Sequence, residues 1–214
     1  EPIRFSRRSI SRAPVTTRRN ALTLNQRSMS APFSHSAGMS GNWRQRLRLA
    51  SGLVLFAFCL THFTNHALGI ISVKAMEKMA LYHYEIWSND FGQLVLVTAA
   101  FTHVGLALWR TAKRSTLKIP FWEFTQLVLG LYIPWTLAPH VAATLGLMNV
   151  HGVIPSYHQM LTILWPEGAL MQSILLLVVW SHAMIGLHFW LRMYPFYRRL
   201  LPLLSALALA FPVL

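Results

Sequence analysis

The segment SGLVLFAFCLTHFTNHALG, residues 51–69, combines two features that rarely occur together. It is apolar over most of its length and has no acidic or basic residue, yet it contains His62 and His66. A histidine inside an apolar segment of membrane-spanning length is costly unless it has a partner. Later apolar segments also contain histidines, namely His103, His140, His182 and His188. The pattern predicts membrane helices that face each other and bind something between them through histidines.

The composition excludes several classes of protein. The chain has 214 residues, of which 54% are hydrophobic and only 12% charged, which is too apolar for an ordinary soluble domain. The net charge of +13 would suggest nucleic acid in a soluble protein, but the basic residues lie outside the apolar segments, where they set membrane orientation. We therefore expect a lipid bilayer and no nucleic acid as partner. The single cysteine, Cys59, excludes a disulfide framework or a cysteine-based iron–sulfur site within this chain.

The apolar segments predict an all-α, polytopic transmembrane helix bundle over residues 49–214. At 1.5 Å per residue, four of them are long enough to cross about 30 Å of hydrocarbon. These four predicted spans cover residues 49–73, 91–109, 121–150 and 169–191. A fifth apolar run, residues 200–214, is short for a crossing, so we expect the sequence to stop inside a truncated fifth helix.

Two segments connect the predicted spans on one side of the bilayer. Residues 74–90 contain charges and interfacial aromatic residues, which predicts a short amphipathic helix on the membrane surface with His83 facing solvent or the interface. Residues 151–167 contain no Lys or Arg and are predicted to form a loop.

Residues 1–48 differ from the rest of the chain. They contain ten arginines, many serines and threonines, and one acid, Glu1, so this segment is predicted to be basic and disordered. Two alternatives stay open. The true start could be Met29 or Met39, with mistranslated sequence before it, or the segment could be a mitochondrial transit peptide, which has a similar composition.

The distribution of charge predicts the orientation. Residues 1–48, 110–118 and 192–199 are basic, whereas residues 74–90 and 151–167 are poor in Lys and Arg. The positive-inside rule therefore places the N-terminus in the cytoplasm.

The depths of the histidines predict two layers. Measured from the inner surface, His103 and His182 lie roughly 10 and 15 Å deep, whereas His62 and His140 lie roughly 20 and 28 Å deep. Each layer then takes its two histidines from different helices, as bis-histidine ligation of a haem requires. We therefore predict two b-type haems, with His103 and His182 as iron ligands of one and His62 and His140 as iron ligands of the other. Small residues near them were expected to let a flat porphyrin approach: Gly52, Gly105, Gly130 and Gly186.

Other interpretations of these histidines stay open at this point. A single intramembrane histidine more often bonds to a neighbouring helix than to a metal. Bundles rich in histidine also bind zinc, copper or non-haem iron. Such sites often add a carboxylate, as do proton and ion transporters, and no acid lies deep within a predicted span. Haem fits this pattern best.

The arrangement resembles the dihaem cytochrome b membrane anchor of succinate dehydrogenases and fumarate reductases. In that family, helices one to four of a five-helix anchor supply the ligands, and helix one pairs with helix three and helix two with helix four. The matching positions here are Gly52 with His62, His103 with Arg110, Gly130 with His140, and His182 with Gly186 and Arg192.

A second resemblance covers about residues 42–214. The strings RLRLASGLVLFAFCLTHFTNHALG, QLVLGLYIPWTLAPH and VVWSHAMIGLHFWLR resemble the N-terminal anchor of bacterial membrane-bound class III adenylate cyclases. The resemblance implies a redox-sensing, quinone-responsive dihaem module in a bacterial cell membrane, coupled to cAMP formation by a cyclase domain beyond residue 214. It also implies a homodimer through that domain. No cyclase catalytic residue lies in this chain.

The two resemblances lead to two functions. The first is the sensor and anchor of a cyclase; the alternative is an electron-transfer subunit that anchors a succinate dehydrogenase or fumarate reductase and exchanges electrons with quinone. The sequence does not place a quinone site, for which the candidate residues are His66, Tyr132, Trp180 and His188.

Overall fold

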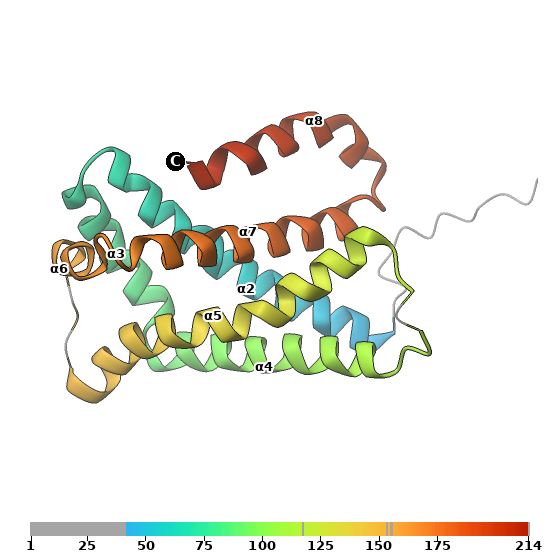
Figure 1. Cartoon of the computed structure of the whole chain (residues 1–214), viewed down its shortest axis with the longest axis horizontal. Helices are drawn as coiled ribbons and strands as arrows, with labels where there is room; N and C mark the ends of the chain where they lie inside the picture. Colours follow the sequence, from blue (N-terminus) through green and yellow to red (C-terminus); the bar gives the residue numbers. More distant parts are fainter. Residues whose placement is uncertain (1–41, 117, 153, 155, 214) are drawn as a thin grey trace, which may run out of the picture. The chain divides into compact units, whose positions relative to one another are not determined.

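The computed structural model describes residues 42–116, 118–152, 154 and 156–213. Within these residues all regular structure is helical, which confirms the predicted all-α fold (Figure 1). The long helices are α2 (Trp43–Ala67), α4 (Asp90–Ala112), α5 (Phe121–His151) and α7 (Ala169–Leu191). The shorter elements are the 3-10 turn η1 (Leu68–Ile70), α3 (Val73–Trp87), α6 (Tyr157–Leu164), α8 (Pro195–Ala210) and the 3-10 turn η2 (Phe211–Val213).

Four helices are long and apolar enough to cross a membrane, as predicted. They are Trp43–Ile70, Asp90–Ala112, Phe121–His151 and Ala169–Leu191. Large apolar side chains on them point outward: the exposed fraction is 77% for Phe101 and 81% for Trp135. Side chains of this kind need lipid around them, so the chain is a multi-pass membrane protein.

The first span begins earlier than the sequence predicted. Helix α2 starts at Trp43 rather than at residue 49, because the Asn42 side chain accepts a hydrogen bond from the backbone N–H of Arg44 and so caps the helix. The last residues of the predicted disordered segment are therefore helical. The other calls on residues 1–41, including the alternative start sites, lie outside the described residues.

The segment predicted as a loop, residues 151–167, contains helix α6. That prediction was wrong because it overlooked a capping box, in which the Ser156 side chain accepts a bond from the backbone of Gln159 while the Gln159 side chain bonds back to the Ser156 N–H. The amphipathic helix predicted at residues 74–90 is present as α3.

Helix α8, which contains most of the fifth apolar run, begins at Pro195, a residue that suits the first position of a helix. It turns back alongside α7 (Figure 1). Two hydrogen bonds join these helices. The Trp180 Nε1–H donates to the Ala208 carbonyl oxygen at 2.7 Å, and His188 Nδ1 lies 2.8 Å from the Tyr197 hydroxyl.

The spans are arranged as two helix pairs. Helix α2 packs against α4, and α5 packs against α7. At the end where α3 and α6 lie, the Tyr157 N–H donates to Glu77 Oε1 at 2.7 Å, and the buried Asn65 side chain donates to the Tyr157 hydroxyl. We call the opposite end, where α2 and α5 begin and α4 and α7 end, the basic end.

Candidate functional site

Each predicted histidine pair comes together in the structure. The rings of His103 and His182 have centroids 6.3 Å apart, and those of His62 and His140 have centroids 6.0 Å apart. In both cases one ring belongs to the α2–α4 pair and the other to the α5–α7 pair. The histidines therefore face each other across the space between the two helix pairs.

In the pair nearer the basic end, a backbone oxygen fixes each ring. His103 Nδ1 lies 3.0 Å from the Arg48 carbonyl oxygen, and His182 Nδ1 lies 3.1 Å from the Gln126 carbonyl oxygen. Because a carbonyl oxygen only accepts, each Nδ1 must carry the proton and donate it. In a neutral imidazole this leaves the lone pair on Nε2, the state in which a metal-binding histidine coordinates.

Two glycines make room for these rings. A Cβ at Gly52 would lie 2.9 Å from His103 Cε1, and a Cβ at Gly130 would lie 2.8 Å from His182 Cε1. Gly52 follows Arg48 by four residues, and Gly130 follows Gln126 by the same interval. The two helix pairs therefore hold their histidines in the same way. One turn of α2 supplies both the hydrogen-bond acceptor and the space for His103 of α4, and one turn of α5 does the same for His182 of α7.

The expectation that four glycines would admit a flat porphyrin stays a prediction, and the structure shows what each of these glycines borders. Gly52 and Gly130 contact imidazole rings, as described above. A Cβ at Gly186 would lie 2.8 Å from Gln126 Nε2, so this glycine accommodates a side chain. A Cβ at Gly105 would meet nothing within 4 Å, so of these four glycines only Gly105 borders open space.

The second pair is held differently. His140 Nδ1 lies 3.1 Å from Gln172 Oε1, so a side chain, rather than the backbone, accepts its proton. His62 Nε2 lies 3.2 Å from His66 Nε2 on the next turn of the same helix. A metal on His62 Nε2 would displace that contact, so this pair is less prepared for a ligand than the first.

His83 is a member of this second cluster that the sequence analysis missed. Its ring lies 5.4 Å from the His62 ring, and its Nε2 is buried with no hydrogen-bond partner among the described residues. Burial lowers the pKa of His83, which favours its neutral form. The prediction that His83 faces solvent is wrong, because α3 turns this face toward α2. The alternative, that His83 lies at the membrane interface, stays a prediction.

The helical spacing contained a signal for this orientation. Met76, Ala80, His83 and Trp87 recur at the intervals of one helix face. Met76 and Ala80 are buried, and the Trp87 Nε1–H donates to the Thr61 hydroxyl at 3.1 Å. No such signal identified Gln172, because its partner His140 lies on another helix.

The spacing of both pairs suits two ligands on opposite sides of one metal. Imidazole–metal bonds of about 2 Å place two such ring centroids about 6 Å apart. Within the described part of the chain, no three His, Cys, Asp or Glu side chains are grouped to hold a metal ion by themselves. Each pair could supply two imidazole nitrogens to a metal.

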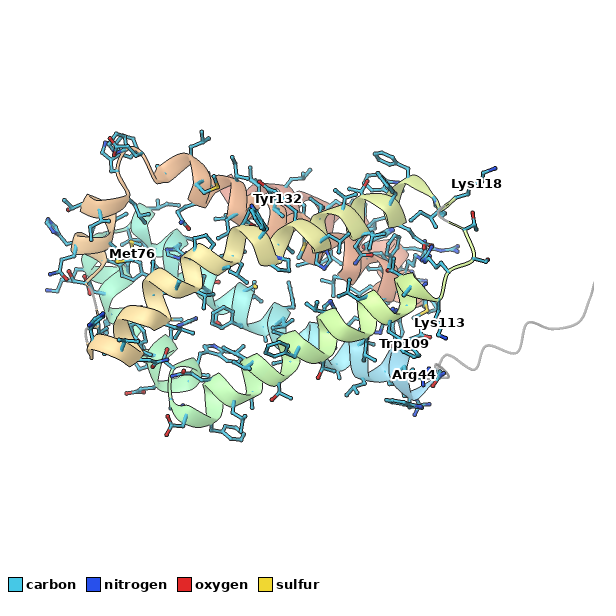
Figure 2. The ribbon with its side chains drawn as sticks, turned by 60° about the horizontal axis from the view of Figure 1, so that its bottom comes forward. Arg44, Met76, Trp109, Lys113, Lys118 and Tyr132 are labelled. Atoms are coloured by element: carbon cyan, nitrogen blue, oxygen red, sulfur yellow. The ribbon has the colours of Figure 1, made fainter. Side chains whose placement is uncertain are left out.

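A cavity of about 200 Å³ lies between α2, α7 and η2. Its wall is mainly apolar and aromatic, and His66 contributes an imidazole to it. Two of the four quinone candidates, His66 and Trp180, line it together. The others lie elsewhere: His188 bonds to the Tyr197 hydroxyl, and Tyr132 lies on α5 with an exposed fraction of 42% (Figure 2).

Comparison with known proteins adds no relative: no family model, curated protein or solved structure matches the chain. The fold and the composition define the class, a multi-pass α-helical membrane protein.

Proposed function

We propose that the chain is a dihaem b-type redox module of the membrane. His103 and His182 are the axial ligands of one haem, and His62 and His140 those of the other. The observation that carries this proposal is the pairing itself: four histidines from four helices meet as two facing pairs with ring centroids 6.3 and 6.0 Å apart.

The surroundings of the rings suit ligation. A bis-histidine b-type haem has no open iron position and supplies one-electron transfer. Three of the four histidines hold Nδ1 against an oxygen acceptor, which directs the remaining nitrogen, Nε2, to a metal. Such outer partners orient the ring and raise its basicity, and this stabilises the metal–nitrogen bond.

The electron-exchange partner in this proposal is a membrane quinone bound in the cavity beside His66. The aromatic and aliphatic wall suits an apolar ring, and His66 offers a ring nitrogen to a quinone oxygen. His66 also lies 3.2 Å from His62, so the cavity adjoins the ligand of one proposed haem. Oxidation of a hydroquinone releases two electrons and two protons, which matches two one-electron acceptors.

The module serves, on this proposal, as the redox-sensing anchor of a class III adenylate cyclase in a bacterial cell membrane. Support comes from the three strings that resemble such anchors and from the basic segments, which favour an N-terminus in the cytoplasm by the positive-inside rule. Dimerisation through a cyclase domain belongs to the same proposal. An anchor subunit for succinate dehydrogenase or fumarate reductase would use the same haem ligands, and an assay of the natural protein in its membrane for cAMP formation and for succinate oxidation distinguishes the two.

A reduced-minus-oxidised absorbance spectrum of the detergent-purified chain, with haem quantified against protein, tests the proposal. We expect about two b-type haems per chain. His182→Ala should remove the haem proposed on His103 and His182 and leave the other haem in place. His62→Ala should remove the haem proposed on His62 and His140 and leave the first in place. His158→Ala is the matched control, because this histidine is exposed on α6 outside the pairs.

Two results would contradict the haem assignment, and a third would contradict the quinone partner. Absence of haem from protein made in cells that supply it would leave the histidines as contacts between helices. Loss of both haems from each single variant, with His158→Ala intact, would refute two separate sites. A short-chain hydroquinone that fails to reduce fully loaded protein would refute the quinone partner alone.

A further inference from the structure

The basic end has a large imbalance of charge among the described residues. Ten Lys and Arg residues of the described helices and loops lie at this end, against one acid, Glu123. Glu123 is already engaged, since Arg114 Nη2 donates to its carboxylate at 2.8 Å. The basic residues are Arg44, Arg46, Arg48, Arg110, Lys113, Arg114, Lys118, Arg192, Arg198 and Arg199.

Two of these cations are held against one indole ring. The Arg44 guanidinium carbon lies 5.3 Å from the centroid of the Trp109 ring, and Lys113 Nζ lies 5.1 Å from that ring. Figure 2 shows Arg44, Trp109 and Lys113 together at the end of the helices, with Lys118 farther away at the same end. Arg44 also lies 5.3 Å from the Trp43 ring. We call Trp43, Arg44, Trp109 and Lys113 the cation–indole cluster.

The cluster gathers like charges without a protein anion. Cation–π contacts at exposed sites are each worth only about 0.5–1 kcal/mol, and two like charges nearby repel each other. No carboxylate forms an ion pair with Arg44 or Lys113 among the described residues. An anion from outside the protein would relieve this repulsion and form charge-assisted hydrogen bonds with both cations.

The position of the cluster indicates where that anion comes from. Trp43 is the first residue of the span Trp43–Ile70, and Lys113 directly follows the span Asp90–Ala112. Both residues therefore lie at the level of the lipid headgroups. The exposed fractions of Trp43 and Trp109 are 63% and 49%, so both indoles present apolar surface and an N–H donor to the interface. The chains of a lipid can pack against this apolar surface while its phosphate lies beside the cations.

We propose that the cation–indole cluster binds the phosphate of an anionic lipid headgroup, with Arg44 and Lys113 as its ligands and the two indoles against the lipid glycerol and chains. This site does not depend on haem or quinone. It would anchor the start of α2 to the end of α4, the two helices that contribute His62 and His103.

Thermal-shift titration of the full purified chain in neutral detergent tests the site. The added probe is phosphatidylglycerol, compared with phosphatidylcholine of identical chains and with inorganic phosphate. Because binding to the folded state raises the melting temperature, the shift gives a half-saturating lipid concentration. We expect phosphatidylglycerol alone to stabilise the wild type, and this effect to weaken as salt is added.

The decisive comparison is between two double variants that remove equal charge from the same end. Arg44→Gln/Lys113→Gln should raise the half-saturating concentration roughly 10- to 30-fold, as expected for two cations near an anionic surface. Arg198→Gln/Arg199→Gln, which alters exposed arginines at the start of α8, should leave it near the wild-type value.

Several outcomes would overturn the proposal. Equal weakening by both double variants would show that diffuse charge, and not the cluster, attracts the lipid. Equal stabilisation by phosphatidylcholine, whose phosphate is neutralised by a choline cation, would show that the net negative charge of the headgroup has no role. Saturation by inorganic phosphate alone would show a site for free anions. If the first double variant does not fold, a wild-type affinity that is independent of salt refutes the proposal by itself.

Discussion

Gly130→Ala is the substitution that most directly tests how the structure positions His182. The added Cβ would lie 2.8 Å from His182 Cε1 and 3.3 Å from its Nδ1, whereas carbon atoms in favourable contact lie about 3.5–4.0 Å apart. The imidazole must therefore turn or move away from α5. Either movement breaks the 3.1 Å hydrogen bond from His182 Nδ1 to the Gln126 carbonyl oxygen.

The expected magnitude follows from three effects. Overpacking costs about 1–3 kcal/mol, and leaving a buried donor unpaired costs about 1–3 kcal/mol. Alanine is favoured over glycine within a helix by about 1 kcal/mol. One movement of the ring causes both costs, so they overlap, and we expect Gly130→Ala to lower the free energy of unfolding by about 1–3 kcal/mol.

Gly105→Ala is the matched control. It is also a glycine within a span, but its Cβ would meet no atom within 4 Å, so only the gain in helix propensity remains, about 1 kcal/mol. The two substitutions should therefore shift stability in opposite directions.

Denaturant unfolding in mixed micelles, followed by circular dichroism, measures the stability of each variant, and a haem spectrum follows the proposed ligand. Gly130→Ala should also lower occupancy of the haem proposed on His182 while sparing the one proposed on His62. Equal or greater stability of Gly130→Ala relative to wild type would refute the reasoning, since it would show that the ring is free to move.

Two further predictions concern the end where α3 and α6 lie and the second histidine pair. Tyr157→Phe removes the hydroxyl that accepts from the buried Asn65, which is 2% exposed, and should cost about 1–3 kcal/mol in the same unfolding assay. An unchanged unfolding midpoint would show that water replaces the hydroxyl. Gln172→Leu removes the acceptor for His140 Nδ1. In a spectroelectrochemical titration it should shift the reduction potential of the haem proposed on His62 and His140 and leave the other potential unchanged. Gln126→Leu is its control, because His182 bonds to the Gln126 backbone carbonyl, which this change retains; a shift of both potentials by Gln172→Leu would contradict the assignment.

Hydropathy was sufficient to predict the spans, because no water is available within the bilayer to satisfy the backbone, so a long apolar segment must be a helix. The fourth span was predicted with the bounds that α7 has, Ala169–Leu191. The histidine pairs also followed from sequence, since depth along a regular helix is proportional to residue number. Helix α6 was not predicted because a capping box, and not hydropathy, defines its start.

The sequence by itself determined that this is an all-α membrane protein and which histidines share a level. It could not determine the partners of those histidines, because hydrogen bonds between helices depend on how each helix is rotated about its axis. Only the tertiary structure placed Gln172 against His140, turned His83 toward His62, and brought Arg44 onto Trp109. These contacts join residues far apart in the chain, and the packing of side chains between helices, which no local pattern encodes, selects them.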